Sequence, residues 1–172
     1  VLLARATGRD DVVFGTAVSG RPPRLSGAAT MIGLFVTTVP VRATLRARDT
    51  FAEVAARVQA AQGALYDHHH LGLAEIQALA GGGDLFDTLL VLESYPFDPA
   101  TLIPPGGPRL VGLDGHDATH YALTIRVIPG ERPRLSFGYQ RGALADAAVT
   151  GLADRMVALL AQVAADPDRP VG

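Results

Sequence analysis

Hydrophobic and polar positions along the chain alternate between short apolar runs and helical repeats, which predicts a mixed α/β domain. Residues 12–18 and 31–42 are apolar, rich in β-branched side chains and bounded by Gly and Pro, so each predicts a buried strand or a turn that feeds one. Residues 86–96 have a continuous apolar centre and predict a central strand buried on both faces. Residues 119–128 and 135–139 alternate apolar and polar positions, which predicts a hairpin with a half-exposed first strand.

Two longer helices are expected between these strands and after them. Thr50 and Glu53 have the capping-box spacing at the start of a helix that extends to about residue 67, and Asp146 is expected to cap the last helix. The expected buried stripes are Phe51, Val54, Ala55, Val58 and Leu65 on the first helix, and Val149, Leu152, Met156, Leu159, Leu160 and Val163 on the last. A short helix is predicted over residues 73–80 before a Gly triplet, and another helix ends at Gly8.

Segments without a helical or strand pattern are also informative. Residues 97–117 contain four prolines and four glycines, and so long a loop in a compact domain is expected to be functional or mobile. Residues 166–170 cannot continue a helix and are interpreted as a linker. The first residue is not Met and the chain opens on the last turns of a helix, so we expect it to be part of a longer polypeptide.

Length and composition exclude several classes of function. The 172 residues are enough for one domain with a sizeable core, and the net charge of −2 argues against a nucleic-acid-binding surface. The absence of Cys excludes disulfides, thiol catalysis and Cys-ligated zinc, and it fits a cytoplasmic location. No signal peptide is evident and no apolar run approaches the length of about 20 residues that spans a membrane, so no membrane association is expected.

Candidate chemistry in the sequence is sparse. His68, His69 and His70 are adjacent, and adjacent residues point in different directions, so they are not expected to share a metal ion. They also lack a suitably spaced carboxylate, so we interpret them as structural or surface residues. Glu93 lies near a predicted strand end, where it is a site residue or, as we favour, either an edge-facing charge or the partner of an Arg.

Two segments carry a resemblance to a known family. Residues 14–42 read FGTAVSGRPPRLSGAATMIGLFVTTVPVR, and residues 85–96 read LFDTLLVLESYP. The SGRP turn, the loop and the IGLFV–PVR run resemble, in order and spacing, the carboxy-terminal half of a condensation domain of nonribosomal peptide synthetases. The family usually has Asn where this chain has Thr37. Its catalytic motif, His-His-x-x-x-Asp-Gly, does not fit the register of the three histidines, so no catalytic residue is expected in this chain.

The resemblance implies a fold and a division of labour. The fold would be a chloramphenicol-acetyltransferase-like α/β (α+β) lobe, a mixed sheet flanked by helices, with residues 97–117 as a crossover latch. The latch would pair residues 110–113 with a strand outside this chain. Residues 1–165 would form the C-terminal lobe, and residues 166–172 would begin the linker to an adenylation domain. Such a lobe would supply tunnel wall, floor loop and latch for peptide-bond formation, while the catalytic His motif lies in the N-terminal lobe.

The floor loop supplies the candidate site residues. The residues that we expect along the substrate tunnel are Ser19, Arg21, Gly33, Thr37 and Thr38. The hydroxyls of Ser19, Thr37 and Thr38 would hold a thioester carbonyl or a water, or would bond neighbouring backbone instead. Arg21 is expected to tie down the loop rather than to bind phosphate.

The resemblance also implies substrates and partners. No cofactor or metal would bind directly, and the phosphopantetheine arms of carrier proteins would be substrates. The implied partners are the N-terminal lobe, peptidyl carrier proteins and the adjacent adenylation domain, in antibiotic or secondary-metabolite synthesis. Three alternatives remain open: a non-catalytic recruitment module, a lobe of an epimerisation domain and a free-standing acyltransferase of the same fold.

Overall fold

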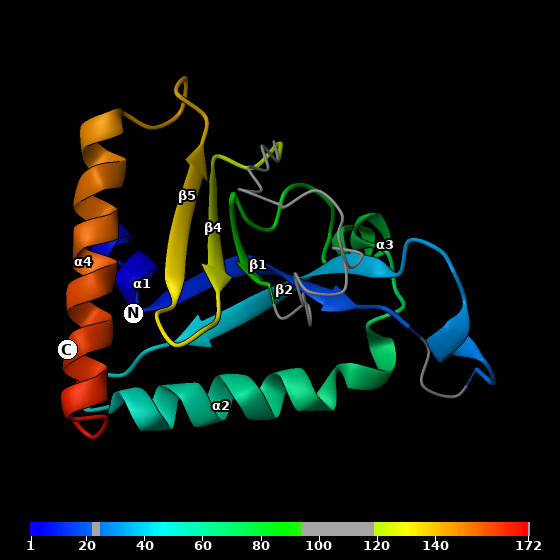
Figure 1. Cartoon of the computed structure of the whole chain (residues 1–172), viewed down its shortest axis with the longest axis horizontal. Coiled ribbons are helices and arrows are strands. Elements are labelled where there is room, and N and C mark those ends of the chain that lie inside the picture. Colours follow the sequence, from blue (N-terminus) through cyan, green and yellow to red (C-terminus); the bar gives the residue numbers. More distant parts are fainter. Residues whose placement is uncertain (22–24, 94–118, 172) are drawn as a thin grey trace, which may run out of the picture.

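A computed structural model describes residues 1–21, 25–93 and 119–171, in which five strands form one mixed sheet in the order β2-β1-β3-β4-β5 (Figure 1). The strands are β1 (Asp11–Ser19), β2 (Val36–Thr44), β3 (Thr88–Leu92), β4 (Leu123–Ile128) and β5 (Arg134–Tyr139). β1, β3 and β4 are parallel to one another, and the outer strands pair antiparallel with their neighbours. The predicted hairpin and the central position of β3 are therefore confirmed, but β3 is buried on both faces only at Thr88 and Leu89, and Leu92 is 60% exposed.

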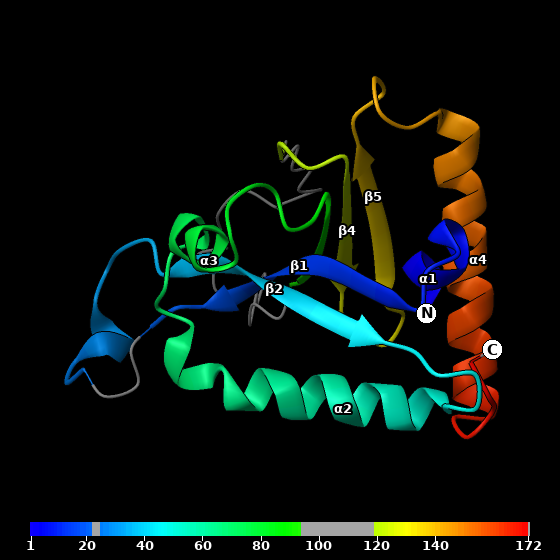
Figure 2. The same cartoon turned by 180° about the vertical axis from the view of Figure 1, so that it is seen from behind.

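In the described ranges, four α-helices accompany the sheet: α1 (Leu2–Thr7), α2 (Phe51–Ala64), α3 (Leu73–Leu79) and α4 (Asp146–Ala165). Figures 1 and 2 show α2 along the β1–β2 pair, and α4 beside β5 with α1 next to it. Single 3-10 turns lie at Ala28–Thr30 and Tyr66–His68. Gly8 ends α1 in the left-handed conformation and Gly81–Gly83 follow α3 with positive φ, as the sequence predicts.

The two faces of the sheet differ in chemistry. Val12 and Ala43 lie opposite each other on one face and form a core cluster with Ala4 of α1, against which Val58 of α2 packs. Side chains alternate along a strand, so the strand residues next to Val12 and Ala43 point to the other face. That face includes Gly15, Leu89 and Thr124, which pair across β1, β3 and β4. We call this second face the polar face, since it carries every charged strand residue: Asp11, Arg42, Arg126 and Arg134.

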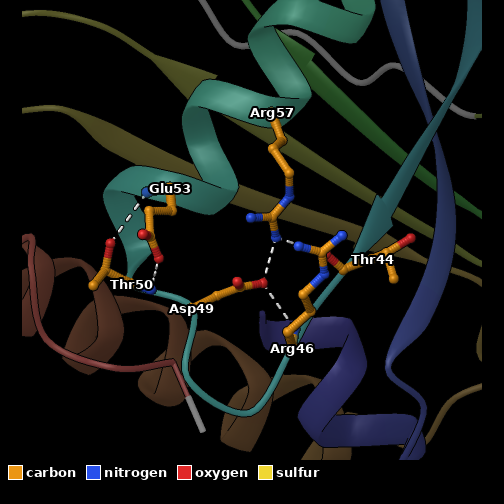
Figure 3. Close-up of polar contacts among 6 residues, drawn as sticks. All are labelled: Thr44, Arg46, Asp49, Thr50, Glu53 and Arg57. Atoms are coloured by element: carbon orange, nitrogen blue, oxygen red, sulfur yellow. Dashed lines mark hydrogen bonds and ion pairs between the residues drawn. The ribbon is translucent and has the colours of Figure 1, made fainter.

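The start of α2 confirms the predicted capping box. The Thr50 hydroxyl accepts a hydrogen bond from the Glu53 N–H at 3.2 Å, and the Glu53 carboxylate accepts one from the Thr50 N–H at 2.9 Å (Figure 3). The helix ends at Ala64 rather than near residue 67, because the chain tightens into the 3-10 turn. Ala55, within the helix, and Leu65, just after its end, are exposed, so the expected stripe is wrong at these two positions.

The last helix differs from expectation at its start and along its length. Ala145 is the N-cap, and Asp146 instead accepts a hydrogen bond from the Tyr139 hydroxyl at 2.8 Å, which raises the pKa of Tyr139. Val149 is buried but Leu160 is exposed. Among the described residues, one helix, α4, is long enough and apolar enough to cross a membrane by length and composition alone. The hydropathy of the sequence did not lead us to expect this feature.

The two remaining strand expectations have different outcomes. Residues 31–35 are not part of a strand, so the first part of the second apolar run follows the expected alternative of a turn that feeds a strand, and the rest forms β2. β4 is not half exposed, because Thr124 on its polar face is only 3% exposed and its hydroxyl contacts that of Thr119 at 2.6 Å. The long loop and the latch fall on residues 94–118, outside the described residues.

The segment interpreted as a linker begins by docking onto the domain. Val171 is buried, its N–H donates to the Asp49 carbonyl at 2.8 Å, and its carbonyl accepts a hydrogen bond from Arg5 at 3.0 Å. Pro170 forms a β-bridge with Thr50. The boundary between residues 165 and 166 stays a prediction.

A polar cluster fixes the loop on which this tail docks. Asp49 is buried, and its carboxylate accepts hydrogen bonds from the Arg57 guanidinium and from the Arg46 N–H (Figure 3). Arg57 also donates to the Thr44 carbonyl at 3.0 Å. The hydrogen bond from Arg57 holds the pKa of Asp49 below its ordinary value.

Candidate functional site

The carboxyl ends of the parallel strands form the most informative edge of the sheet. In open α/β sheets, ligands bind outside the carboxyl ends of such strands. Ser19 ends β1, and Glu93 directly follows β3 with its N–H bonded to the Val127 carbonyl at 2.9 Å. Side chains at this edge are therefore the first candidates for contact with a substrate.

Two of the predicted hydroxyls lie on the polar face near this edge. Ser19 pairs with Val36 and Thr38 pairs with Ala17, so alternation places both hydroxyls on the same side of the sheet. In the described part of the chain neither hydroxyl has a hydrogen-bond partner, whereas Thr16 donates to the Leu90 carbonyl at 3.0 Å. These two hydroxyls thus keep their capacity for an external partner.

Thr37 does not join them. It pairs with Val18, and it lies on the helix-covered face, opposite to that of Thr38. The structure thus does not bring the two adjacent threonines together, since neighbouring residues of a strand point to opposite sides. Among the predicted residues, Ser19 and Thr38 are brought to one surface, and Thr37 is not.

Arg21 organises the connection between β1 and β2. Its guanidinium donates hydrogen bonds to the carbonyls of Ala28 and Met31, the latter at 2.9 Å, and lies 4.1 Å from the centre of the Phe35 ring. This is the tie-down role expected from the sequence. A planar group with five donors suits such a task, because it can bond two carbonyls and stack at once.

The residues that Arg21 ties together form an exposed apolar arm, which we define as residues 25–36. Ile32 is 104% exposed and Leu34 is 93% exposed, and Leu25, Met31 and Val36 are also exposed. Figure 1 shows the arm projecting beyond the end of the sheet. Gly33 is exposed within it, beside the ring of Phe35. Several exposed apolar side chains on one segment mark a candidate interaction surface.

Gly20 and the histidine turn meet at the base of the arm. The Gly20 N–H donates to the Phe35 carbonyl at 2.7 Å, and a Cβ on Gly20 would lie 2.9 Å from that oxygen and 3.0 Å from the His69 carbonyl oxygen. The ring of His69 contacts the edge of Tyr66. Among the described residues, no group of three His, Cys, Asp or Glu side chains is arranged to hold a metal ion. These contacts support the structural interpretation of the histidines.

Glu93 and Arg126 form an ion pair on the polar face, with 3.7 Å between Oε1 of Glu93 and Nε of Arg126. The pairing of Glu93 with an arginine, which the sequence favoured, is thus confirmed. Sequence reasoning did not identify Arg126 as the partner. The sequence did contain a signal: Thr124 and Arg126 are two residues apart, so both lie on the face of β4 opposite to its apolar side chains.

A cavity of about 600 Å³ opens at the other edge of the sheet, near the amino ends of the parallel strands, and no sequence pattern predicted it. Its lining includes Arg9, Asp87, His120 and Gln140. The ring of Phe86, also in the lining, stacks on Tyr121 at 5.4 Å, and a Cβ on Gly15 would lie 2.2 Å from it. The cavity is thus separate from the hydroxyls and the ion pair at the carboxyl edge.

Comparison with known proteins agrees with this fold and loop pattern. The profile of the family described as "Condensation domain" matches residues 1–172. Vanchrobactin synthetase VabF of Vibrio anguillarum is 46% identical over 140 residues, which are 81% of this chain and 5% of that protein. Chondramide synthase cmdD of Chondromyces crocatus is 37% identical over 171 residues, which are 98% of this chain and 4% of that protein.

Solved structures share the fold. The first condensation domain of the CDA synthetase superposes with a TM-score of 0.74 at 24% identity, over 98% of this chain and 38% of that one. The X-domain in its complex with OxyB from teicoplanin biosynthesis superposes with a TM-score of 0.74 at 27% identity, over the same shares of the two chains.

The chain therefore spans a small part of the curated relatives and about two fifths of the solved condensation-domain chains. Condensation domains act on carrier-bound thioesters and catalyse peptide-bond formation. With a family match along its whole length, this chain belongs to the condensation domains of nonribosomal peptide synthetases and has the chloramphenicol-acetyltransferase-like fold.

Proposed function

We propose that this chain is the C-terminal lobe of a condensation domain and supplies one wall and the floor loop of the tunnel in which the peptide bond forms. The observation that carries this proposal is the apolar arm, residues 25–36. The arm leaves the carboxyl edge of the sheet, where the hydroxyls of Ser19 and Thr38 also lie. A second lobe placed against this edge would enclose both.

The energetics of the arm favour a permanent partner. Burying one large aliphatic side chain is worth about 1.5–3 kcal/mol, and the arm exposes both Ile32 and Leu34 almost completely. Arg21 meanwhile fixes the arm through two carbonyls and the ring of Phe35. A surface that is apolar and already ordered loses little entropy on association. The N-terminal lobe of the same domain is the proposed partner.

The chemistry of the described residues supports a non-catalytic role within that domain. The three histidines lie in a turn whose geometry is explained by Tyr66, Asp67 and Gly20. The proposed catalytic His motif belongs to the N-terminal lobe, and this lobe alone is expected to be inactive. Phosphopantetheine arms of peptidyl carrier proteins are the proposed substrates, with no cofactor bound to the lobe itself.

Neighbouring domains complete the proposal. Residues 1–165 form the lobe, and residues 166–172 begin a connection to an adenylation domain. The crossover latch is assigned to residues 97–117, which lie outside the described residues. Gly33 and Arg21 act on the substrate path through the shape of the arm, while Thr37 supports it from the helix-covered face.

A pair of substitutions tests the role of the arm. In the intact synthetase that contains this chain, Ile32→Asp with Leu34→Asp is expected to reduce peptide-bond formation by about a hundredfold or more, because charges would enter the lobe interface. Val157→Asp is the control, since Val157 is 58% exposed on α4, which lies at the opposite end of the molecule from the arm (Figure 1). Turnover at the wild-type rate in the doubly substituted enzyme would refute the proposal.

A recruitment module is the second candidate function. Its support is the similarity to the X-domain, whose structure was solved in complex with OxyB. The two candidates differ in the full-length protein: a condensing enzyme joins donor and acceptor thioesters in a reconstituted assay, whereas a recruitment module binds a partner protein without forming the bond.

A further inference from the structure

Glu93 and Arg126 form an ion pair that orients the Glu93 carboxylate but leaves its oxygens able to accept further hydrogen bonds. Val91 pairs with Arg126 in the sheet, and alternation places Glu93 on the same polar face. The hydrogen bond from the Glu93 N–H to the Val127 carbonyl keeps its backbone in register with β4. The acidic side chain is thus presented at a fixed position at the carboxyl edge.

The geometry of this pair differs from that of the tight pairs of the molecule. Asp11 binds Arg42 through three contacts of 2.6–3.1 Å. The Glu93–Arg126 separation of 3.7 Å is longer than an N–H···O hydrogen bond, and the Glu93 side chain is 41% exposed. Its carboxylate oxygens therefore retain acceptor capacity for another donor.

Arg126 orients that carboxylate. Its side chain is only 15% exposed, and an arginine stays ionised at every physiological pH. Placing a guanidinium on a sheet is costly unless acidic or polar groups face it.

The surroundings indicate which ligand would suit this carboxylate. Thr16 of β1 pairs with Leu90 of β3. Ser19 is three residues after Thr16 and Glu93 is three residues after Leu90, so the two residues lie at similar positions along their strands. The hydroxyls of Ser19 and Thr38 share the polar face with Glu93. A carboxylate on a face that also carries hydroxyls suits a primary amine, which is a cation with several donors when protonated.

We propose that Glu93, oriented by Arg126, binds the amino group of the acceptor substrate; this inference rests on the proposed function. An amino group next to a carbonyl is partly protonated near neutral pH, so a fixed carboxylate would hold it through a charge-assisted hydrogen bond. Glu93 is a binding and positioning group in this assignment, and it exchanges no proton with the substrate.

The test uses the intact synthetase with a donor-loaded carrier protein and a soluble aminoacyl thioester as acceptor. Glu93→Gln is expected to raise the KM for the acceptor about tenfold, the size of one charge-assisted hydrogen bond, with kcat and the KM for the donor nearly unchanged. Glu93→Asp keeps the charge and is expected to retain most of the acceptor affinity. Glu131→Gln, in the turn between β4 and β5, is the matched control.

A competitor pair separates amine recognition from a structural role. The test compares two inhibitors, an acceptor analogue with a free amine and its isostere with a hydroxyl in place of the amine. The wild type is expected to bind the amine about tenfold more tightly than the hydroxyl compound, and Glu93→Gln is expected to bind both equally. The preference of the wild type should also weaken as the pH rises through the pKa of the amine. Equal loss of affinity for both analogues would overturn the inference, as would an unchanged acceptor KM in a variant that melts at the wild-type temperature.

The two proposals fail in different ways. If Glu93→Gln leaves acceptor binding unchanged while the arm substitutions still abolish turnover, the amine assignment is wrong and the lobe assignment stands. If the arm substitutions leave turnover intact, the proposed function itself fails.

Discussion

The guanidinium of Arg5, near the start of the chain, donates a hydrogen bond of 3.0 Å to the carbonyl of Val171, near its end. The N–H of Val171 in turn bonds to the Asp49 carbonyl in the loop before α2. α1, the β2–α2 loop and the tail after α4 are thus joined at one point. The tail is therefore held against the domain as far as Val171.

Truncation after residue 166 should therefore destabilise the domain. The loss includes burial of the Val171 side chain, worth about 2 kcal/mol, and the hydrogen bonds of its backbone. Urea unfolding of the complete condensation domain with and without the tail measures the difference. Arg5→Met, which keeps the apolar stem of the side chain, should reproduce only a part of it, and identical unfolding midpoints for the truncated and complete domains would contradict the docked tail.

Asp49→Asn is expected to remove an acid-sensitive contribution to stability. Since the hydrogen bond from Arg57 lowers the pKa of Asp49 in the folded state, the folded protein binds a proton less readily than the unfolded chain. The contribution is therefore complete above the unfolded pKa of about 3.9 and is lost as the pH falls through the lower folded value. Unfolding free energies measured between pH 3 and pH 7 should fall less steeply toward acid in Asp49→Asn than in wild type.

The control for this pH dependence is Asp84→Asn. Asp84 is exposed and, within the described part of the chain, has no basic partner, only a long contact with Gln77 at 3.5 Å. Its substitution should leave the acid limb of the stability curve in place. A curve for Asp49→Asn that parallels the wild type would show that Arg57 does not stabilise the ionised carboxyl group.

Local rules predicted the elements that depend on neighbouring residues. The Thr50–Glu53 capping box and the left-handed Gly8 are signals contained within a few residues, and both are confirmed. Because side chains alternate along a strand, the sequence also implied that Thr37 and Thr38 point to opposite faces, although we expected both along the substrate tunnel. Strand pairing was needed to show which of the two shares a face with Ser19.

Long-range features could not be read from the sequence. The apolar run at residues 31–42 fits either a buried strand or a turn that feeds one. The exposure of Ile32 and Leu34 could not be read from it, because apolarity alone does not say whether the covering surface belongs to the same lobe. Likewise, the Pro-rich tail has linker composition, and its docking depends on Asp49 and Arg5, which are more than a hundred residues away.

Arg21→Lys should loosen the apolar arm while leaving the sheet intact. A lysine keeps the positive charge but cannot bond two carbonyls in one plane and stack on Phe35 at the same time. Backbone amides of residues 25–36 should exchange hydrogen about tenfold faster or more, and peptide-bond formation should fall with them. Arg132→Lys, in the exposed β4–β5 turn, is the control, and unchanged exchange in the arm would contradict the tie-down role.

Gly15→Ala and Gly151→Ala should change stability in opposite directions. A Cβ at Gly15 would lie 2.2 Å from the Phe86 ring, so the ring must move and its stacking on Tyr121 is disturbed; overpacking of this kind costs about 1–3 kcal/mol. Gly151 lies within α4, and a Cβ there would meet no atom within 4 Å outside the helix's own backbone, so alanine should stabilise the helix by about 0.5–1 kcal/mol. Urea unfolding of both variants of the complete domain measures the signs. If Gly15→Ala is neutral, the ring is not packed against β1, and the wall of the 600 Å³ cavity is looser than the stacking with Tyr121 implies.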